Sequence, residues 1–193
     1  MTPQHPRNAT SVPLTDQLAD RWSPRSFDAD FEIAPDDLTA LGEAARWAPS
    51  ANNAQPSRFI VGRRGTPTFA SIVAALRPVN QGWAPRASVL IVALAETQRD
   101  GRPLRWAEYD LGQAVAHLTV EAESRGLSVR QMGGFDPDAL RAAFALPPEL
   151  VPVTVVAVGR YDAAADLPEE IRQRDAAPRL RRGLDELALI LDV

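Results

Sequence analysis

Several residue types are missing or scarce in this chain of 193 residues, and each absence excludes a kind of chemistry. There is no cysteine, which excludes disulfide bonds, thiolate catalysis and cysteine-ligated metals. The two histidines, His5 and His117, are too few for a histidine metal cluster, so no metal site is expected. There is no lysine either, because all 21 basic residues are arginine. This excludes Schiff-base catalysis and leaves guanidinium as the cation for gripping a phosphate.

Long apolar runs and an excess of positive charge are also absent. No run approaches the length of a membrane span, and the polar segment Met1–Leu14 is no signal peptide. A net charge of −4 gives no general electrostatic basis for nucleic-acid binding. The glycine signatures of the Rossmann fold and of the P-loop are missing as well. We therefore expect a cytoplasmic protein with neither a membrane nor nucleic acid as partner.

The order of the predicted elements indicates an α+β fold. Residues 1–13 are expected to form a flexible arm, and residues 14–193 a single domain. The hydrophobic spacing predicts helices over 15–21, 35–48, 67–76, 106–125 and 136–146, and strands over 58–62, 87–94, 127–130 and 151–160. Residues 167–193 are read as a charged helical piece, an arginine cluster and an apolar tail. Because the elements lack a βαβ rhythm, we expect a mostly antiparallel or mixed sheet sandwiched by helices.

An unusually polar loop separates the second helix from the first strand. It is bracketed by Pro49, which ends the helix, and by Pro56, which fixes the entry to the strand. Between the prolines lie four uncharged polar side chains, those of Ser50, Asn52, Asn53 and Gln55. Such a rigid loop, rich in amide donors and acceptors, suits a neutral heteroaromatic ligand. An ordinary capped turn is the alternative, because Ser and Asn favour turns anyway.

Two short arginine clusters stand at opposite ends of the chain. In the first, Arg21, Ser23 and Arg25 occupy alternate positions, which puts two guanidiniums and a hydroxyl on one face of an extended segment. Such a face suits a phosphate, although nearby arginines are more often solvated. The second cluster comprises Arg179, Arg181 and Arg182. The two clusters could converge on one phosphate, which the sequence alone does not show.

A glycine pair, Gly133-Gly134, follows a short predicted strand and precedes a capped helix. It either exposes backbone N–H groups to a ligand or simply makes a tight turn. No acid–base apparatus is evident, since His117 lies alone in a helix and the acidic pairs sit in first turns, where the helix dipole favours them. No catalytic side chain is therefore expected.

Taken in order, these segments resemble the nitroreductase family of FMN-dependent oxidoreductases. The matching segments are 21–27 (RWSPRSF), 48–56 (APSANNAQP) followed by Phe59-Ile60-Val61, Gly126-Leu127 leading to 133–136 (GGFD), and the arginines near the C-terminus. The resemblance spans roughly residues 14–190, so that 14–193 would be an FMN-binding domain. It implies a three-layer α-β-α sandwich with a mostly antiparallel central sheet. It also implies a homodimer with FMN at the interface and helix 106–125 at its core.

The resemblance also assigns residues to the cofactor. Around the phosphate and the flavin pyrimidine edge it implies Arg21, Trp22, Ser23, Arg25 and Asn80. It implies Arg179 and Arg181 as C-terminal phosphate ligands, and a register that uses Arg182 is equally possible. From the partner subunit it implies Pro49, Ser50, Ala51 and Asn53. Beside flavin N5 and O4 it implies the segment Met132, Gly133 and Gly134.

Three positions depart from the family pattern. Ala51 replaces a second serine, and Ser57 stands where a tryptophan is frequent. Trp83 stands where some members place a lysine that helps to hold negative charge on reduced flavin. The chain is also short and lacks the long insertions that form substrate lids in some members, so we expect a broad, open site.

The activity implied by the resemblance is ping-pong hydride transfer. NADH or NADPH would give hydride to N5 of FMN, and a small-molecule acceptor such as a nitroaromatic, a quinone or an enone would then take it. The cofactor carries this chemistry, which agrees with the lack of catalytic side chains. Two alternatives stay open. One is an FMN-dependent dehydrogenase, dehalogenase or flavin-consuming enzyme of the same family, and the other is a non-catalytic FMN-binding dimer.

Overall fold

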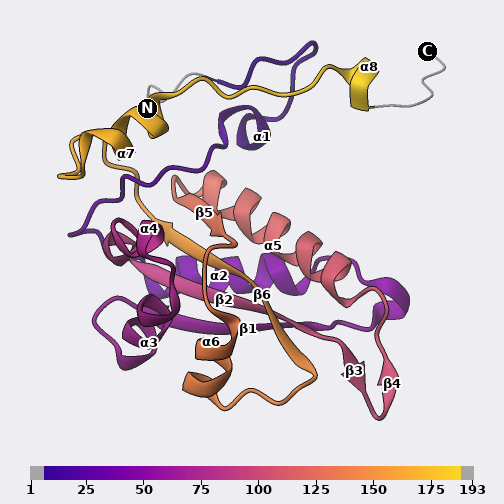
Figure 1. Cartoon of the computed structure of the whole chain (residues 1–193). Helices are drawn as coiled ribbons and strands as arrows, with labels where there is room; N and C mark the ends of the chain where they lie inside the picture. Colours follow the sequence, from indigo (N-terminus) through magenta and orange to yellow (C-terminus); the bar gives the residue numbers. More distant parts are fainter. Residues whose placement is uncertain (1–6, 188–193) are drawn as a thin grey trace.

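A four-stranded sheet with helices on both faces forms the centre of the protein (Figure 1). The computed structural model describes residues 7–187. The strands are β1 (Ser57–Arg63), β2 (Val89–Glu96), β5 (Ser128–Met132) and β6 (Leu150–Gly159), with a separate hairpin of β3 (Gln98–Arg99) and β4 (Arg102–Pro103). The helices are α1 (Asp16–Asp20), α2 (Pro35–Arg46), α3 (Pro67–Ala75), α4 (Pro78–Gln81), α5 (Ala107–Ser124), α6 (Pro137–Phe144), α7 (Glu169–Ala176) and α8 (Leu184–Leu187).

The strand order in the sheet is β1-β2-β6-β5, and every pairing is antiparallel. This confirms the α+β class and the antiparallel sheet expected from the sequence. The register between β2 and β6 shifts at Ala93/Leu94, where Leu94 pairs with Pro152. Proline has no N–H to give to the ladder, so a bulge is where a central strand tolerates it.

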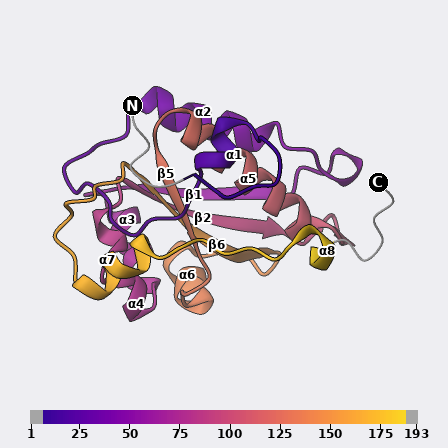
Figure 2. The ribbon, with the colours of Figure 1, turned by 90° about the horizontal axis from the view of Figure 1, so that it is seen from above.

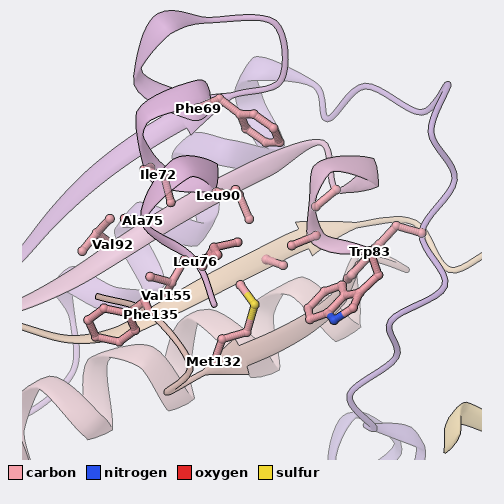
Figure 3. Packing of buried hydrophobic residues seen from close by; sticks show 14 of the residues in the cluster. Phe69, Ile72, Ala75, Leu76, Trp83, Leu90, Val92, Met132, Phe135 and Val155 are labelled. Atoms are coloured by element: carbon pink, nitrogen blue, oxygen red, sulfur yellow. The ribbon is translucent and has the colours of Figure 1, made fainter. Parts of the chain in front are cut away.

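The two faces of the sheet follow from the alternation of side chains along β2. Leu90, Val92 and Leu94 point to one face and pack with residues of α3 and α6 (Figure 3). Val89 and Ile91 point to the other face and pack with α2 and α5. Both faces are apolar because both are covered, which explains the unbroken apolar run that the sequence displays there.

Two segments expected to be loops contain short regular elements. Residues 96–103 form the β3–β4 hairpin, whose turn residues Asp100 and Gly101 have φ values of 51° and 73°. An Asp-Gly pair favours a two-residue turn of this kind, so the sequence did carry the signal. In the segment 78–85, Pro78 begins the helix α4, the first turn being a favoured position for proline.

The N-terminal and C-terminal segments meet beside the end of the sheet formed by β5 and β6 (Figures 1 and 2). The backbone N–H of Asn8, within the expected arm, donates to Ala19 O in α1 at 2.7 Å. The first six residues of that arm and most of the expected apolar tail lie outside the described residues. In residues 7–187, no helix has the length and apolar character needed to cross a membrane.

Candidate functional site

The Arg21-Ser23-Arg25 segment continues directly from α1 and is held in place by a carboxylate from the far end of the chain. Asp175 in α7 accepts hydrogen bonds from the N–H groups of Arg25 (2.7 Å) and Ser26 (2.9 Å) and from the Ser26 hydroxyl (2.9 Å). It also pairs with the Arg25 guanidinium at 3.1 Å. Asp175 is buried, with its side chain 3% exposed, so these contacts fix the segment against α7.

The two arginine clusters converge, which the sequence left open. Nη1 of Arg179 donates to the carbonyl oxygen of Arg21 at 3.2 Å, and Nη1 of Arg21 donates to the Ser23 hydroxyl at 3.0 Å. Burial lowers the pKa of Arg21, and the nearby charge of Arg181 lowers it further. The pKa of Arg179 is lowered by burial and then by the charges of Arg21 and Arg181. Arg21 and Arg179 thus lie in a region of positive potential, which favours an anion.

Two carboxylates lie near these arginines: Asp20, which is paired with Arg7 and also attracts Arg179, and Glu123, which attracts Arg21 and Arg179. Glu123, near the C-terminal end of α5, has a pKa raised by burial, which the attraction of Arg21 and Arg179 opposes. A raised pKa means that the ionised carboxylate is a poorly solvated counter-charge. The arrangement thus keeps an excess of positive charge around Arg21.

A fifth cation, Arg130 in β5, was not expected from the sequence. Its Nη1 donates to the carbonyl oxygen of Ser23, and its guanidinium carbon lies 5.6 Å from the centre of the Trp83 ring. Burial lowers the pKa of Arg130, and the charge of Arg25 adds to this effect. Trp83 itself is 1% exposed, and its Nε1 is buried without a hydrogen-bond partner in the described part of the chain.

Asn80 and Gly134, which were each predicted to contact the cofactor, also lie side by side. Nδ2 of Asn80 donates to Gly134 O at 3.0 Å, and a Cβ added to Gly134 would lie 2.7 Å from that nitrogen. Gly134 is therefore required for the close approach of Asn80.

Gly133 is exposed, whereas the side chain of Met132 is 3% exposed and lies in the core beside Trp83 (Figure 3). Trp22 is 8% exposed and packs edge-to-face on Tyr161, with ring centres 4.9 Å apart.

The proline-bracketed loop is rigid, as expected, but its anchors were not foreseen. The Ser50 hydroxyl accepts the N–H of Gln55 at 3.0 Å, and Oδ2 of the buried Asp110 in α5 accepts the N–H of Ala51 at 3.1 Å. Asn52 and Asn53 have φ values of 52° and 55°, in the left-handed region that asparagine tolerates better than most residues. The side chain of Asn53 is consequently presented at the surface.

A cavity of about 280 Å³ lies at the foot of this loop. It is bounded by the C-terminal end of α2, by Pro49, Ser50 and Pro56 of the loop, and by Asp110 of α5. Pro49 is exposed at its rim and Pro56 is buried. The loop is therefore one wall of a pocket within a single chain.

The loop and the arginine site lie at opposite ends of α5. Asp110 holds the loop near the start of that helix, and Glu123 lies beside Arg21 near its end. Thirteen residues of helix separate the two carboxylates, a distance of about 20 Å at 1.5 Å per residue. One chain therefore does not bring all the predicted site residues to one place.

Sequence reasoning missed Asp110, Arg130 and Asp175, for different reasons. Asp110 stands in the first turn of a helix, where an acidic residue is favoured by the helix dipole and attracts no notice. Arg130 occupies a polar position in the alternation of its strand, where an arginine attracts no notice. Asp175 belongs to a charged helix and has no distinguishing local pattern.

Comparison with known proteins establishes the family of the chain. The family model described as the nitroreductase family matches residues 18–67 and 65–160, which is most of the chain. The chain belongs to the nitroreductase family. An uncharacterised 15.4 kDa protein of Mycolicibacterium smegmatis is 41% identical over 138 residues, which cover 68% of this chain and 93% of that protein.

Solved structures of other nitroreductase-like proteins share the fold. A crystal structure described as an oxidoreductase containing FMN has a TM-score of 0.88 at 30% identity, over 97% of this chain and 96% of that one. A provisionally named nitroreductase from Desulfovibrio desulfuricans, in complex with FMN, has a TM-score of 0.75 at 25% identity, over 95% and 99% of the two chains. A relative from Archaeoglobus fulgidus, provisionally named an NADH dehydrogenase/NAD(P)H nitroreductase, is 26% identical over 140 residues, 68% of this chain and 76% of its own length.

Proposed function

We propose that this nitroreductase-family chain is an FMN-dependent oxidoreductase that takes electrons from NADH or NADPH. The observation that carries the proposal is the convergence of the two arginine clusters: Arg21 donates to the Ser23 hydroxyl, Arg179 donates to the Arg21 carbonyl, and the charge of Arg181 acts on both. A phosphate dianion would relieve the mutual repulsion of these guanidiniums and accept hydrogen bonds from them. The FMN named in the titles of two similar structures carries such a phosphate.

The remaining residues of the site fit the ring system of FMN. Asn80 and the backbone at Gly133 and Gly134 offer an amide and main-chain groups without side-chain bulk. Trp83 contributes a buried aromatic ring, with the guanidinium carbon of Arg130 5.6 Å from its centre. When bound, FMN would supply hydride transfer through N5 from the nicotinamide to an acceptor such as a nitroaromatic, a quinone or an enone.

The proposal includes a homodimer, because a second copy supplies what one chain lacks. Two α5 helices packed antiparallel about a two-fold axis would bring the 49–56 loop of one chain to the arginine site of the other. The large exposed side chains of Trp47, Trp106 and Tyr109, near the loop end of α2 and α5, support such an interface. The helices on both faces of the sheet support the expected three-layer sandwich. A cytoplasmic location stays a prediction.

The direct test is the absorbance spectrum of the purified protein, before and after incubation with FMN and gel filtration. We expect flavin bands with close to one FMN per chain, followed by bleaching when NADH or NADPH is added without oxygen. A colourless protein that retains no FMN would refute the proposal. Bound FMN that neither nicotinamide bleaches would instead favour a dehydrogenase, a dehalogenase, a flavin-consuming enzyme or a non-catalytic binder.

A matched pair of variants links that spectrum to the arginine site. Arg179→Gln removes a guanidinium of the converging group, and Arg172→Gln removes an exposed one whose partner is Glu169 in the same helix. We expect FMN affinity to fall by about tenfold or more in the first variant and to stay unchanged in the second, because a charge-assisted contact is worth roughly 1.5–3 kcal/mol. Equal affinities in both variants would remove Arg179 from the site.

A further inference from the structure

The arginines of the site divide into two groups on either side of Ser23. The first group consists of Arg21, Arg179 and Arg181, and the Ser23 hydroxyl accepts a hydrogen bond from Arg21 in this group. Arg25 and Arg130 form the second, on the side of the Ser23 carbonyl that accepts from Arg130. A single phosphate needs the first group alone, so the second group calls for a separate explanation.

Arg130 is the unbalanced member of the second group. Arg25 is paired with Asp175, whereas no carboxylate of the described residues lies within ion-pair distance of Arg130. The Arg130 side chain is half-buried, and burial together with the charge of Arg25 lowers its pKa, an effect that the attraction of Asp175 opposes without cancelling. A guanidinium held in this way gains stability when a negative or electron-rich group comes within reach.

The side chains beneath Arg130 are aromatic. Its guanidinium lies over Trp83, whose Nε1 is a buried donor without a partner in residues 7–187, and Trp83 in turn stacks on Phe27. In Figure 3 the indole nitrogen of Trp83 is turned away from Leu90, toward the outside of the apolar cluster. A half-buried cation therefore lies against an aromatic side chain, with no carboxylate of residues 7–187 at ion-pair distance.

The charge of FMN suggests what the second group is for. Its phosphate is a dianion in every redox state, whereas its ring is neutral when oxidised and gains negative charge on the N1–O2 edge when reduced. The three-arginine group matches the constant charge, and the pair of Arg25 and Arg130 matches the charge that appears on reduction. Trp83 is neutral and supplies none of this charge, although some family members place a lysine at that position.

We propose that the positive charge of Arg130, together with that of Arg25, stabilises the reduced flavin ring. Arg130 thereby supplies the positive charge that the neutral Trp83 does not. This inference rests on the proposed function. Its consequence is that Arg130 sets the reduction potential of bound FMN, while Arg21, Arg179 and Arg181 set the affinity.

The experiment compares Arg130→Gln with Arg181→Gln in the FMN-loaded protein. Glutamine at 130 keeps a donor for the Ser23 carbonyl and removes the charge. We expect Arg130→Gln to weaken binding of reduced FMN about tenfold more than binding of oxidised FMN, a fall of about 30 mV in the midpoint potential of a two-electron couple. Arg181→Gln is expected to weaken both redox forms equally and to leave the potential unchanged.

Two further measurements make the outcome decisive. Arg130→Lys restores a charge and should recover most of the potential, which a merely structural role would not do. An unchanged potential in Arg130→Gln, or an equal loss of affinity for both redox forms, would overturn the inference and assign Arg130 to the phosphate group. A wild-type chain that binds no FMN would overturn the proposed function itself, and this result is distinct from an altered or unaltered potential.

Discussion

Asp175 is a single side chain that joins segments about 150 positions apart. It accepts two backbone N–H groups and a hydroxyl and pairs with Arg25, so one carboxylate fixes both the backbone and a side chain of the predicted phosphate segment. A buried carboxylate is stable only when its oxygens are satisfied in this way. Asp175 therefore positions the site without being expected to touch a ligand.

Replacing Asp175 should cost both stability and cofactor affinity. Asp175→Ala leaves the Ser26 N–H and the Arg25 guanidinium without their acceptor, which we expect to lower the free energy of unfolding by about 3 kcal/mol. Asp166→Ala, at an exposed position in the preceding loop, should change it by less than about 0.5 kcal/mol. Urea unfolding of the apo-protein measures both values. Similar stabilities for the two variants would show that Asp175 is no anchor.

At the scale of elements, the contact of α3 with β1 depends on one glycine. A Cβ added to Gly62 would lie 2.7 Å from the backbone nitrogen and 2.8 Å from the Cα of Phe69, in the first turn of α3. These neighbours are backbone atoms, so the helix itself would have to move. A Cβ added to Gly42, an exposed residue in α2, would have no neighbouring heavy atom within 4 Å.

The two glycines predict opposite effects of the same substitution. Gly62→Ala should lower the free energy of unfolding by about 1–3 kcal/mol, because it overpacks the contact between α3 and β1. Gly42→Ala should raise it by up to about 1 kcal/mol, because alanine favours the helix. Thermal or urea unfolding of the two proteins checks the sign. Destabilisation by both, or by neither, would contradict the packing described for Gly62.

For the molecule as a whole, the separation of loop and arginine site along α5 determines how many chains make one site. If the proposed dimer is correct, Asn53 serves the flavin of the partner chain and Arg21 serves the flavin of its own chain. Asn53→Ala alone should then weaken FMN binding and leave the fold intact, because the side chain is exposed. Unchanged affinity would argue against the role given to Asn53.

Mixed dimers test the arrangement directly. A heterodimer of an Asn53→Ala chain and an Arg21→Gln chain contains one site with both native residues and one site with both changes. We expect it to bind one FMN tightly, whereas each homodimeric variant has two weakened sites. Titration of tagged, co-expressed heterodimers with FMN measures this stoichiometry. Two equally weakened sites in the heterodimer would place both residues in the same chain's site.

Local chemistry in the sequence determined the elements and the types of site. Pro49 and Pro56 bounded the loop, the apolar run through Leu90 and Val92 gave the central strand, and the spacing of Arg21, Ser23 and Arg25 suggested an anion site. The inferences about the loop and the strand succeeded because helix ends, strand burial and short turns depend on neighbours within a few positions, whereas the anion site stays a prediction. The family resemblance added the order of these segments.

Only the tertiary structure decided which distant groups meet. The pairing of Asp175 with Arg25, the approach of Arg179 to Arg21 and the position of Arg130 over Trp83 join residues that no local pattern connects. Burial shifts the pKa values as well, since the lowered pKa of Arg21 and the raised pKa of Glu123 depend on what covers them. Desolvation and long-range packing are properties of the folded chain, whereas turns and periodicities are already present in the sequence.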